Sequence, residues 1–586
     1  MGELNDQIAN NLTGPGGQFE VEELEIHGVL TKTWKTAPKN LAAVFNSTKS
    51  HGGKTFLVYR DERYSYHQIH QQVSALQRGL TALGIKRGER VAIAMRNYPE
   101  WIVTFYAAVS MGAIAVPLNS WWTGSELKYG LGDSGSMVLV CDFERLGRLA
   151  PHIPDIRAKN SSFTIIATRS EHEDVEFLTR DTPTASFQEI VGDAVQGGEV
   201  PDLDIDPEEV AAIFYTSGTT GKPKGAAISH RNIISCLMNA FYSSTYRSSV
   251  AKNAPYQAKQ NSNESNSIDS QNSVLLSVPL FHATGCFATL IPNSVAGSKI
   301  ILMHKWDPTE ALNIIERERV TTFGGVPAMV WQVLNHPDFH NYDTSSVRGV
   351  GYGGAPSAPE LVRRIKEYFP TSAPTNGYGL TETAAIVTLN IGDDYIRKPD
   401  SAGPPMPVME LLIANPDGKR VDTGEVGELW IKGPTVIQGY WNKEAETKAS
   451  LQDGWLKTGD IAFLDDENFL HIVDRSKDVV IRGGENVYSV EVESAIFEHQ
   501  GVADVAVVGL PDPVLGEEVC AVIEPKPGYS LTEAEIQAHV AKRLAKFKVP
   551  TFVYFTDKEL PRNAAGKVLK RELRDKVYKA LTERRD

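Results

Sequence analysis

The sequence predicts an α/β protein with a large N-terminal part of βαβ-type sheets plus a β-rich subdomain, followed by a small mobile α+β C-terminal domain. Three observations lead to this prediction. Short β-rich runs alternate with segments of helical periodicity over most of the chain. From Glu425 the pattern changes to short strands broken by Gly and Asp, and after Val479 a compact α+β pattern closes the chain.

The first regular elements follow from apolar spacing. Tyr66 to Leu83 carries apolar residues at helical spacing and ends at Gly84, and Arg90 to Met95 then has the pattern of a strand. Further strands are expected at Val138–Cys141, Phe163–Ala167, Val210–Tyr215, Val274–Val278 and Lys299–Leu302, and C-terminal helices near Val490–Glu498 and Glu533–Leu544.

One uncharged stretch, Trp101 to Leu118, is long enough to raise the possibility of a transmembrane helix. However, Pro99 marks a helix start, Gly112 a helix stop, and Ile114 to Val116 a short buried strand. We therefore expect a buried helix followed by a core strand, and no transmembrane segment.

Two segments interrupt the alternating pattern. Residues 243–272 are rich in Ser, Asn, Gln and Lys, which predicts a disordered or mobile surface insertion of undetermined role. The charged run from Asp474 to Asp478 lies between two patterned regions and predicts a domain boundary. The expected domains are residues 1–475 and 476–586.

Composition limits the partners. The 59 basic and 73 acidic residues give a formal charge of −14, which argues against nucleic acid and anionic membranes but permits a local anion pocket. Four scattered cysteines without a CxxC pair argue against a disulfide framework or zinc site. Without an apolar signal core or a C-terminal peroxisomal signal, a cytoplasmic location is expected, with a peroxisomal one as the alternative. The oligomeric state is not predicted.

The segment from Tyr215 to Gly225 has the chemistry of a polyphosphate site. It follows an apolar strand and contains three glycines, four Ser and Thr hydroxyls and two lysines. It is not a Walker A loop, because only two residues separate Gly218 from Gly221 and Pro223 follows the lysine where Ser or Thr is required.

Further motifs follow this loop in order: Pro279–Gly285, Gly349–Pro356, Asn376–Glu382, Trp455–Asp460, Asp474–Arg475, Gly483–Ser489 and Pro561–Val568. With these motifs the sequence closely resembles the AMP-forming acyl-CoA synthetases of the superfamily that includes carrier-protein adenylation domains and firefly luciferase. The resemblance covers nearly the whole chain.

The resemblance implies roles for four catalytic residues. Lys567 would be the adenylation lysine, and Thr381 would donate to the α-phosphate. Glu382 would help to hold Mg²⁺, which prefers oxygen ligands. His282 would lie beside the carboxylate of the acid.

The resemblance also implies a nucleotide site, a hinge and a thiol route. The nucleotide would be held by Thr216, Ser217, Gly218, Thr219, Thr220, Gly221, Lys224, Gly353, Gly354, Ala355, Pro356, Tyr378, Gly379, Asp460 and Arg475. Among these, Asp460 would bind the ribose and Tyr378 would stack near adenine. Lys477 would be the hinge, and Gly483 and Gly484 would line the CoA tunnel. Ser489 departs from the family pattern, since proline is common there, which leaves details of that loop open.

The implied reaction uses ATP, Mg²⁺ and coenzyme A. A small-molecule carboxylic acid would form an acyl adenylate, and rotation about Lys477 would then exchange Lys567 for the Gly483–Gly484 face, so that a thiol attacks. A medium- or long-chain fatty acid is expected, and an aryl or specialised-metabolite acid delivered to a carrier protein is the alternative. A third reading, an NAD-dependent oxidoreductase, rests on the GxGxxG pattern of Gly349–Gly354 and is weakened by the absence of an acidic residue at the usual ribose position.

Overall fold

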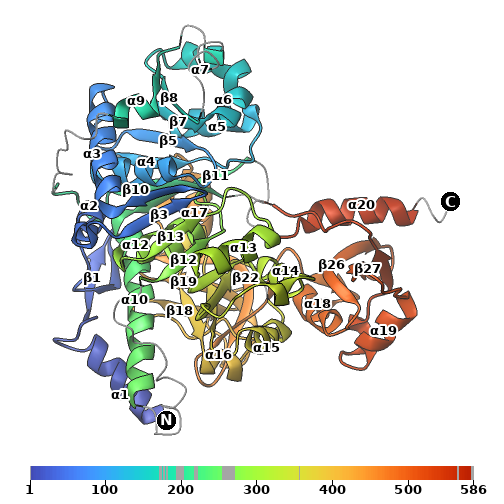
Figure 1. Ribbon diagram of the computed structural model, residues 1–586. Helices are drawn as coiled ribbons and strands as arrows, with labels where there is room; N and C mark the ends of the chain where they lie inside the picture. Colours follow the sequence, from blue (N-terminus) through green and yellow to red (C-terminus); the bar gives the residue numbers. More distant parts are fainter. Residues whose placement is uncertain are drawn as a thin grey trace.

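The computed structural model describes residues 2–169, 175, 178–179, 182–192, 203–216, 222–253, 271–355, 357–563 and 566–582. Over these residues the predicted α/β class is confirmed (Figure 1). No helix in the described ranges is both long and apolar enough to cross a membrane.

Two large sheets form the N-terminal part, and each has eight strands among the described residues. The first has the order β20-β11-β10-β6-β5-β7-β8-β9 and is parallel from β6 through β9. Its strands are β5 (Arg90–Ala94), β6 (Ile114–Pro117), β7 (Val138–Asp142), β8 (Thr164–Thr168), β9 (Thr184–Ser186), β10 (Val210–Thr216), β11 (Lys224–Ser229) and β20 (Gly439–Tyr440).

The second large sheet has the order β17-β16-β15-β14-β12-β13-β3-β4. Its central strands are parallel, and β17 and β4 are antiparallel edge strands. The strands are β3 (Thr55–Tyr59), β4 (Glu62–Ser65), β12 (Ser273–Leu276), β13 (Lys299–Leu302), β14 (Thr322–Gly325), β15 (Gly349–Gly353), β16 (Ala373–Tyr378) and β17 (Thr388–Ile391).

Helices cover these sheets. They are α1 (Gly2–Thr13), α2 (Leu41–Ser47), α3 (Tyr66–Ala82), α4 (Pro99–Ser110), α5 (Gly124–Ser134), α6 (Phe143–Leu149), α7 (Ile153–Lys159), α9 (Phe187–Gly192), α10 (His230–Asn253), α12 (Ile291–Val295), α13 (Pro308–Glu318), α14 (Pro327–Leu334), α15 (Pro359–Tyr368), α16 (Asp393–Arg397) and α17 (Glu444–Ser450). A hairpin of β1 (Val21–Ile26) and β2 (Val29–Trp34) stands apart from both sheets.

A third sheet contains β18 (Glu410–Ala414), β19 (Gly427–Lys432), β21 (Leu451–Gln452), β22 (Trp455–Leu464) and β23 (Leu470–Arg475). This is the predicted β-rich subdomain, and it begins one strand earlier than Glu425. The C-terminal lobe, orange and red in Figure 1, follows with β24 (Val480–Arg482), β25 (Glu485–Val487), α18 (Ser489–Phe497), β26 (Val502–Asp512), β27 (Gly516–Pro525), α19 (Glu533–Ala541), β28 (Phe552–Phe555) and α20 (Lys570–Thr582).

The uncharged stretch from Trp101 to Leu118 forms a core helix and a core strand, as predicted. Pro99 is the first residue of α4, where its missing N–H costs nothing, and the helix ends before Gly112, which has a φ of +74°. Every residue of α4 except Glu100 is buried, and so are all four residues of β6. Burial in protein therefore explains the absence of charge in this stretch.

The prediction of a disordered insertion over residues 243–272 is wrong for its first part. Residues 243–253 are the last part of α10, and Tyr242 packs against Phe19 and Trp34 and stacks on Tyr246, one turn further along. These aromatic contacts anchor a helix whose polar composition alone indicated disorder. Residues 254–270 lie outside the described residues.

The GxGxxG segment is not a nucleotide-binding turn between a strand and a helix. Gly349 to Gly353 form β15 itself, in the middle of the second sheet. A Cβ on Gly324 of the neighbouring strand would lie 1.7 Å from the carbonyl oxygen of Gly351, so glycine here permits close strand packing. The GxGxxG pattern therefore gives no structural support to the alternative of an NAD-dependent oxidoreductase.

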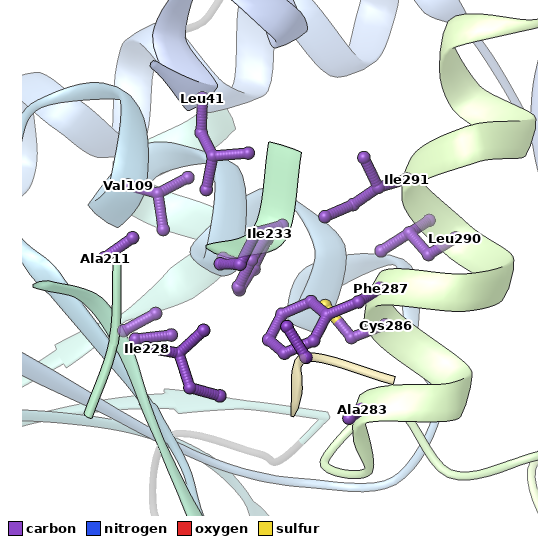
Figure 2. Close-up of a cluster of buried hydrophobic side chains, with 14 of the residues drawn as sticks. Leu41, Val109, Ala211, Ile228, Ile233, Ala283, Cys286, Phe287, Leu290 and Ile291 are labelled. Atoms are coloured by element: carbon purple, nitrogen blue, oxygen red, sulfur yellow. The ribbon is translucent and has the colours of Figure 1, made fainter. Parts of the chain in front are cut away.

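The main hydrophobic core joins the two large sheets. In Figure 2 the π-helix at Thr284–Leu290 presents Cys286, Phe287 and Leu290 toward Ile233 of α10 and Val109 of α4. The C-terminal lobe has hydrophobic clusters of its own. All four cysteines of the chain are buried and unpaired, and burial raises the pKa of each thiol.

Candidate active site

Three predicted nucleotide-binding residues meet where the second and third sheets adjoin. Tyr378 ends β16, and its hydroxyl donates to Asp460 Oδ2 at 2.7 Å. Asp460 on β22 faces Arg475 on β23 across the ladder, and Arg475 Nε donates to Asp460 Oδ1 at 2.9 Å. Because Asp460 is only 4% exposed, both its oxygens have fixed partners in a dry environment.

The segment after Tyr378 folds back tightly on itself. A Cβ on Gly379 would lie 1.4 Å from the carbonyl oxygen of Ala385, so only glycine fits. Ala384 and Ala385 have φ values of +46° and +89°, which L-residues rarely adopt. Such strain is typical of functional segments, and here it lies immediately after the short turn at Thr381–Thr383 that carries two predicted catalytic residues.

A tyrosine that the sequence analysis missed, Tyr440, contacts both Lys224 and Glu382. The Tyr440 hydroxyl donates to Glu382 Oε1 at 2.9 Å, and Lys224 Nζ lies 4.3 Å from the centre of the Tyr440 ring. Strand β20 pairs with β11 so that Tyr440 lies opposite Ala226. Lys224, two residues before Ala226, is therefore close to Tyr440. No spacing pattern marked Tyr440, because it belongs to a two-residue strand far from either partner in sequence.

Lys567 lies in the same site. Burial lowers the pKa of Lys567, the nearby cations Arg475 and Lys477 lower it further, and the carboxylates of Asp460 and Glu382 oppose this effect. These interactions place the lysine of the C-terminal lobe within electrostatic reach of residues on the N-terminal part. The structure thus brings the predicted catalytic lysine near Asp460 and Glu382, the carboxylates predicted to bind ribose and Mg²⁺.

The backbone of the Lys567 segment is braced. Asn563 Oδ1 accepts from the Lys567 backbone N–H at 3.0 Å, and Arg562 Nη1 donates to the Gly566 carbonyl at 2.7 Å. Gly566 has a φ of +75°, and a Cβ there would lie 2.5 Å from Val326 Cγ2 of the N-terminal part. The segment therefore approaches the N-terminal part at a point where only glycine fits.

His282 faces the same region. Burial lowers the pKa of His282 to about 4, with Lys567 adding to the effect, so the ring is neutral at physiological pH. Its buried Nε2 has no hydrogen-bond partner in the part of the chain that the structure describes. A buried polar atom without a partner is unfavourable, and it marks a place that a ligand group can occupy.

The remaining predicted residues are distributed as follows. Gly353, Gly354 and Ala355 lie at the end of β15, beside Gly377 on β16, and therefore close to Tyr378. Thr216 ends β10, and its hydroxyl donates to the Lys224 carbonyl at 3.4 Å. Ser217, Gly218, Thr219, Thr220, Gly221 and Pro356 lie outside the described residues.

The predicted hinge and CoA residues lie at the surface. Lys477 is exposed in the turn between β23 and β24. Gly483 and Gly484 form a two-residue hairpin loop between β24 and β25, with φ values of +61° and +88° that fit a type I′ turn. The hairpin is exposed, whereas Lys567 is half-buried in the candidate site.

The described residues contain no group of three or more His, Cys, Asp and Glu that could hold a metal by themselves. Glu382 is a single carboxylate. One carboxylate still fits Mg²⁺ bound to a polyphosphate, since that ion commonly takes one or two carboxylates and fills its other positions with phosphate oxygens and water.

Comparisons with known proteins agree with this geometry. Residues 44–441 match the family model described as "AMP-binding enzyme", and residues 491–567 match "AMP-binding enzyme C-terminal domain". The chain is 34% identical over 510 residues to a feruloyl-CoA synthase from an Amycolatopsis species, covering 87% of this chain and 93% of the relative. It is 32% identical over 544 residues to a long-chain-fatty-acid–CoA ligase from Bacillus subtilis, covering 89% and 91%. A crystal structure of the anthranilate CoA ligase AuaEII with anthranoyl-AMP superposes with a TM-score of 0.78 at 26% identity, covering 93% of this chain and 98% of that one.

Proposed function

The chain belongs to the AMP-binding enzyme family, and we propose that it is an AMP-forming acid–CoA ligase, which activates a carboxylic acid with ATP and transfers the acyl group to coenzyme A. The observation that supports this most is the position of Lys567, which is half-buried and within electrostatic reach of Asp460, Glu382 and His282. A cation near the carboxylates proposed to bind ribose and Mg²⁺ suits a reaction at the α-phosphate.

In the first half-reaction a carboxylate oxygen of the acid attacks the α-phosphorus of ATP, the bond to the bridging oxygen breaks, and pyrophosphate leaves. Both reactants are anions, so positioning and charge neutralisation contribute most to the rate. Lys567 and Thr381 would bind the α-phosphate oxygens, and Asp460 would accept from the ribose hydroxyls. Glu382, oriented by Tyr440, would hold Mg²⁺, which neutralises phosphate charge.

His282 would contribute as a neutral group. Because burial lowers its pKa to about 4, the ring can donate one N–H to a carboxylate without adding a second cation beside Lys567. Its unpartnered Nε2 is the atom that such a hydrogen bond would use.

In the second half-reaction the CoA sulfur attacks the acyl carbon and AMP leaves. Lys567 would then withdraw, and the Gly483–Gly484 hairpin would take its place through rotation of the C-terminal lobe about Lys477. The exposure of Lys477 and of the hairpin supports this exchange, because neither is held by core packing.

For the acid we propose a medium- or long-chain fatty acid. An aryl acid is the second candidate, and the similarity to the feruloyl-CoA synthase and to the anthranilate CoA ligase favours it. An aryl or specialised-metabolite acid delivered to a carrier protein would use the same first half-reaction.

Pyrophosphate release, measured across fatty, aryl and short branched acids with and without CoA, tests the proposal. We expect release from at least one acid class without CoA, and a thioester once CoA is added. Release from no class would refute acyl adenylation. Adenylate formation that CoA never discharges would refute CoA as the acceptor.

A further inference from the structure

Four polar side chains, two of them buried and two half-buried, connect the end of β23 with the starts of α18 and α20, and we call them the hinge network: Asp474, Ser489, Glu493 and Lys570. The Ser489 hydroxyl lies 3.0 Å from Asp474 Oδ1, and the Ser489 backbone N–H donates to Asp474 Oδ2. Lys570 Nζ lies 2.6 Å from Ser489 Oγ and 2.7 Å from Glu493 Oε1.

The hinge network has little exposure to water, since the side chains of Glu493 and Lys570 are 14% and 19% exposed. Asp474 is 1% exposed and Ser489 is fully buried. Burial lowers the pKa of Lys570, but the carboxylates of Glu493 and Asp474 more than reverse this, so the net pKa is raised and the ammonium stays charged. Hydrogen bonds between charged groups in such an environment are stronger than those at a surface.

The members of the hinge network lie on both sides of the predicted hinge. Asp474 precedes Lys477 and belongs to the third sheet, whereas Ser489, Glu493 and Lys570 belong to the C-terminal lobe. Lys570 also begins α20, three residues after Lys567. The network therefore links the hinge directly to the segment that carries the predicted catalytic lysine.

We propose that Ser489 and Lys570 are positioning residues: Ser489 binds Asp474, Lys570 holds the Ser489 hydroxyl, and together they keep the C-terminal lobe in the orientation that places Lys567 in the active site. The contacts between Ser489 and Asp474 open before thiol transfer. The inference rests on the proposed two-step function. Rotation about Lys477 would carry Ser489, Glu493 and Lys570 together and separate them from Asp474. A contact made in only one of two orientations shifts the equilibrium between them by its own free energy.

Proline at position 489 tests this directly, because it removes both the hydroxyl and the backbone N–H that bind Asp474. The backbone at this position is compatible with proline. Ser489 is the first residue of α18, and the preceding Tyr488 has φ −78° and ψ 118°, which suits a residue before proline. Glu533→Pro is the matched control, since Glu533 is the exposed first residue of α19 and the preceding Thr532 has φ −113° and ψ 153°. Ser489→Ala gives an intermediate change, because it keeps the N–H.

The activity measurement compares the two half-reactions. Loss of charge-assisted hydrogen bonds across the hinge should slow acyl-adenylate formation by about tenfold or more in Ser489→Pro and by less in Ser489→Ala. Conversion of a supplied acyl adenylate to thioester should stay the same or become faster. An equal loss in both half-reactions, or a loss in Glu533→Pro as large as in Ser489→Pro, would overturn the proposal.

A distance measurement separates the inference from the proposed activity. Spin labels at Asp417→Cys and Ala534→Cys, both exposed and one in each part of the chain, report the orientation of the lobe, because the native cysteines are all buried. Ser489→Pro should depopulate the distance that dominates in the wild type, and Glu533→Pro should not. An unchanged distribution in Ser489→Pro would refute the positioning role even if the enzyme proved to have another activity.

Discussion

Replacing Lys567 by Ala removes a cation that the C-terminal lobe contributes to the site. Arg475 cannot substitute for it, because its guanidinium donates to Asp460 at 2.9 Å. Removing one preorganised donor from a buried site costs roughly 10²–10³-fold in rate, or about 3–4 kcal/mol of transition-state stabilisation. We expect this loss of rate in acyl-adenylate formation. The rate at which a supplied acyl adenylate is converted to the thioester should change very little, because Lys567 acts only in the first transition state.

The assay measures pyrophosphate release and, separately, thioester formation from a purified acyl adenylate and CoA. Lys558→Ala is the control, since Lys558 is an exposed lysine of the same lobe. Equal losses in both half-reactions, or wild-type pyrophosphate release, would refute the assignment of Lys567.

The pH dependence gives a second test of the same residue. Burial and the neighbouring Arg475 lower the pKa of Lys567 below its ordinary value of 10.5. Because the protonated form neutralises phosphate charge, adenylation should decline as the pH rises through this lowered pKa, earlier than a free lysine would permit. Lys567→Met should lose this alkaline decline, and an unchanged decline would assign it to another group.

Three further substitutions test the rest of the site. Asp460→Asn removes the negative charge and one acceptor from the ribose position, so the KM for ATP should rise roughly 10–100-fold, and an unchanged KM would exclude ribose binding. Tyr440→Phe deletes the hydrogen bond that orients Glu382, and the Mg²⁺ concentration for half-maximal adenylation should rise about tenfold; equal Mg²⁺ dependence would contradict the metal role. Gly379→Ala places a Cβ 1.4 Å from the Ala385 carbonyl oxygen, so the backbone of the turn must move. Adenylation should fall at least about 100-fold and the thermal stability should fall with it, and full activity would show that the turn need not be tight.

Much of the fold was predictable because buried helices and strands have apolar local sequences. The runs at Arg90–Met95 and Val138–Cys141 are apolar since β5 and β7 are covered on both faces, and both strands form where predicted. The error at residues 243–253 has the opposite cause. Tyr242 packs against Phe19 and Trp34, which are distant in sequence, and Tyr246 stacks on Tyr242, so local polarity gave no sign of the packing.

The site was predictable only as a set of separate motifs. The resemblance named Tyr378, Asp460 and Arg475, and the structure joins them through hydrogen bonds that no spacing rule could specify. Tyr440 and Lys570 were missed for the same reason: each acts through a partner more than fifty residues away. Such pairs depend on sheet order and lobe position, which local sequence patterns do not encode.

The burial of all four cysteines has a chemical consequence for an enzyme of this kind. An acyl adenylate is an electrophile that any accessible thiolate would consume, and Cys286 lies only four residues after His282. Burial raises the pKa of its thiol, and thiolates rather than thiols are the nucleophiles. The protein can therefore hold a reactive acyl group while it waits for an external thiol, with no internal sulfur competing for the product.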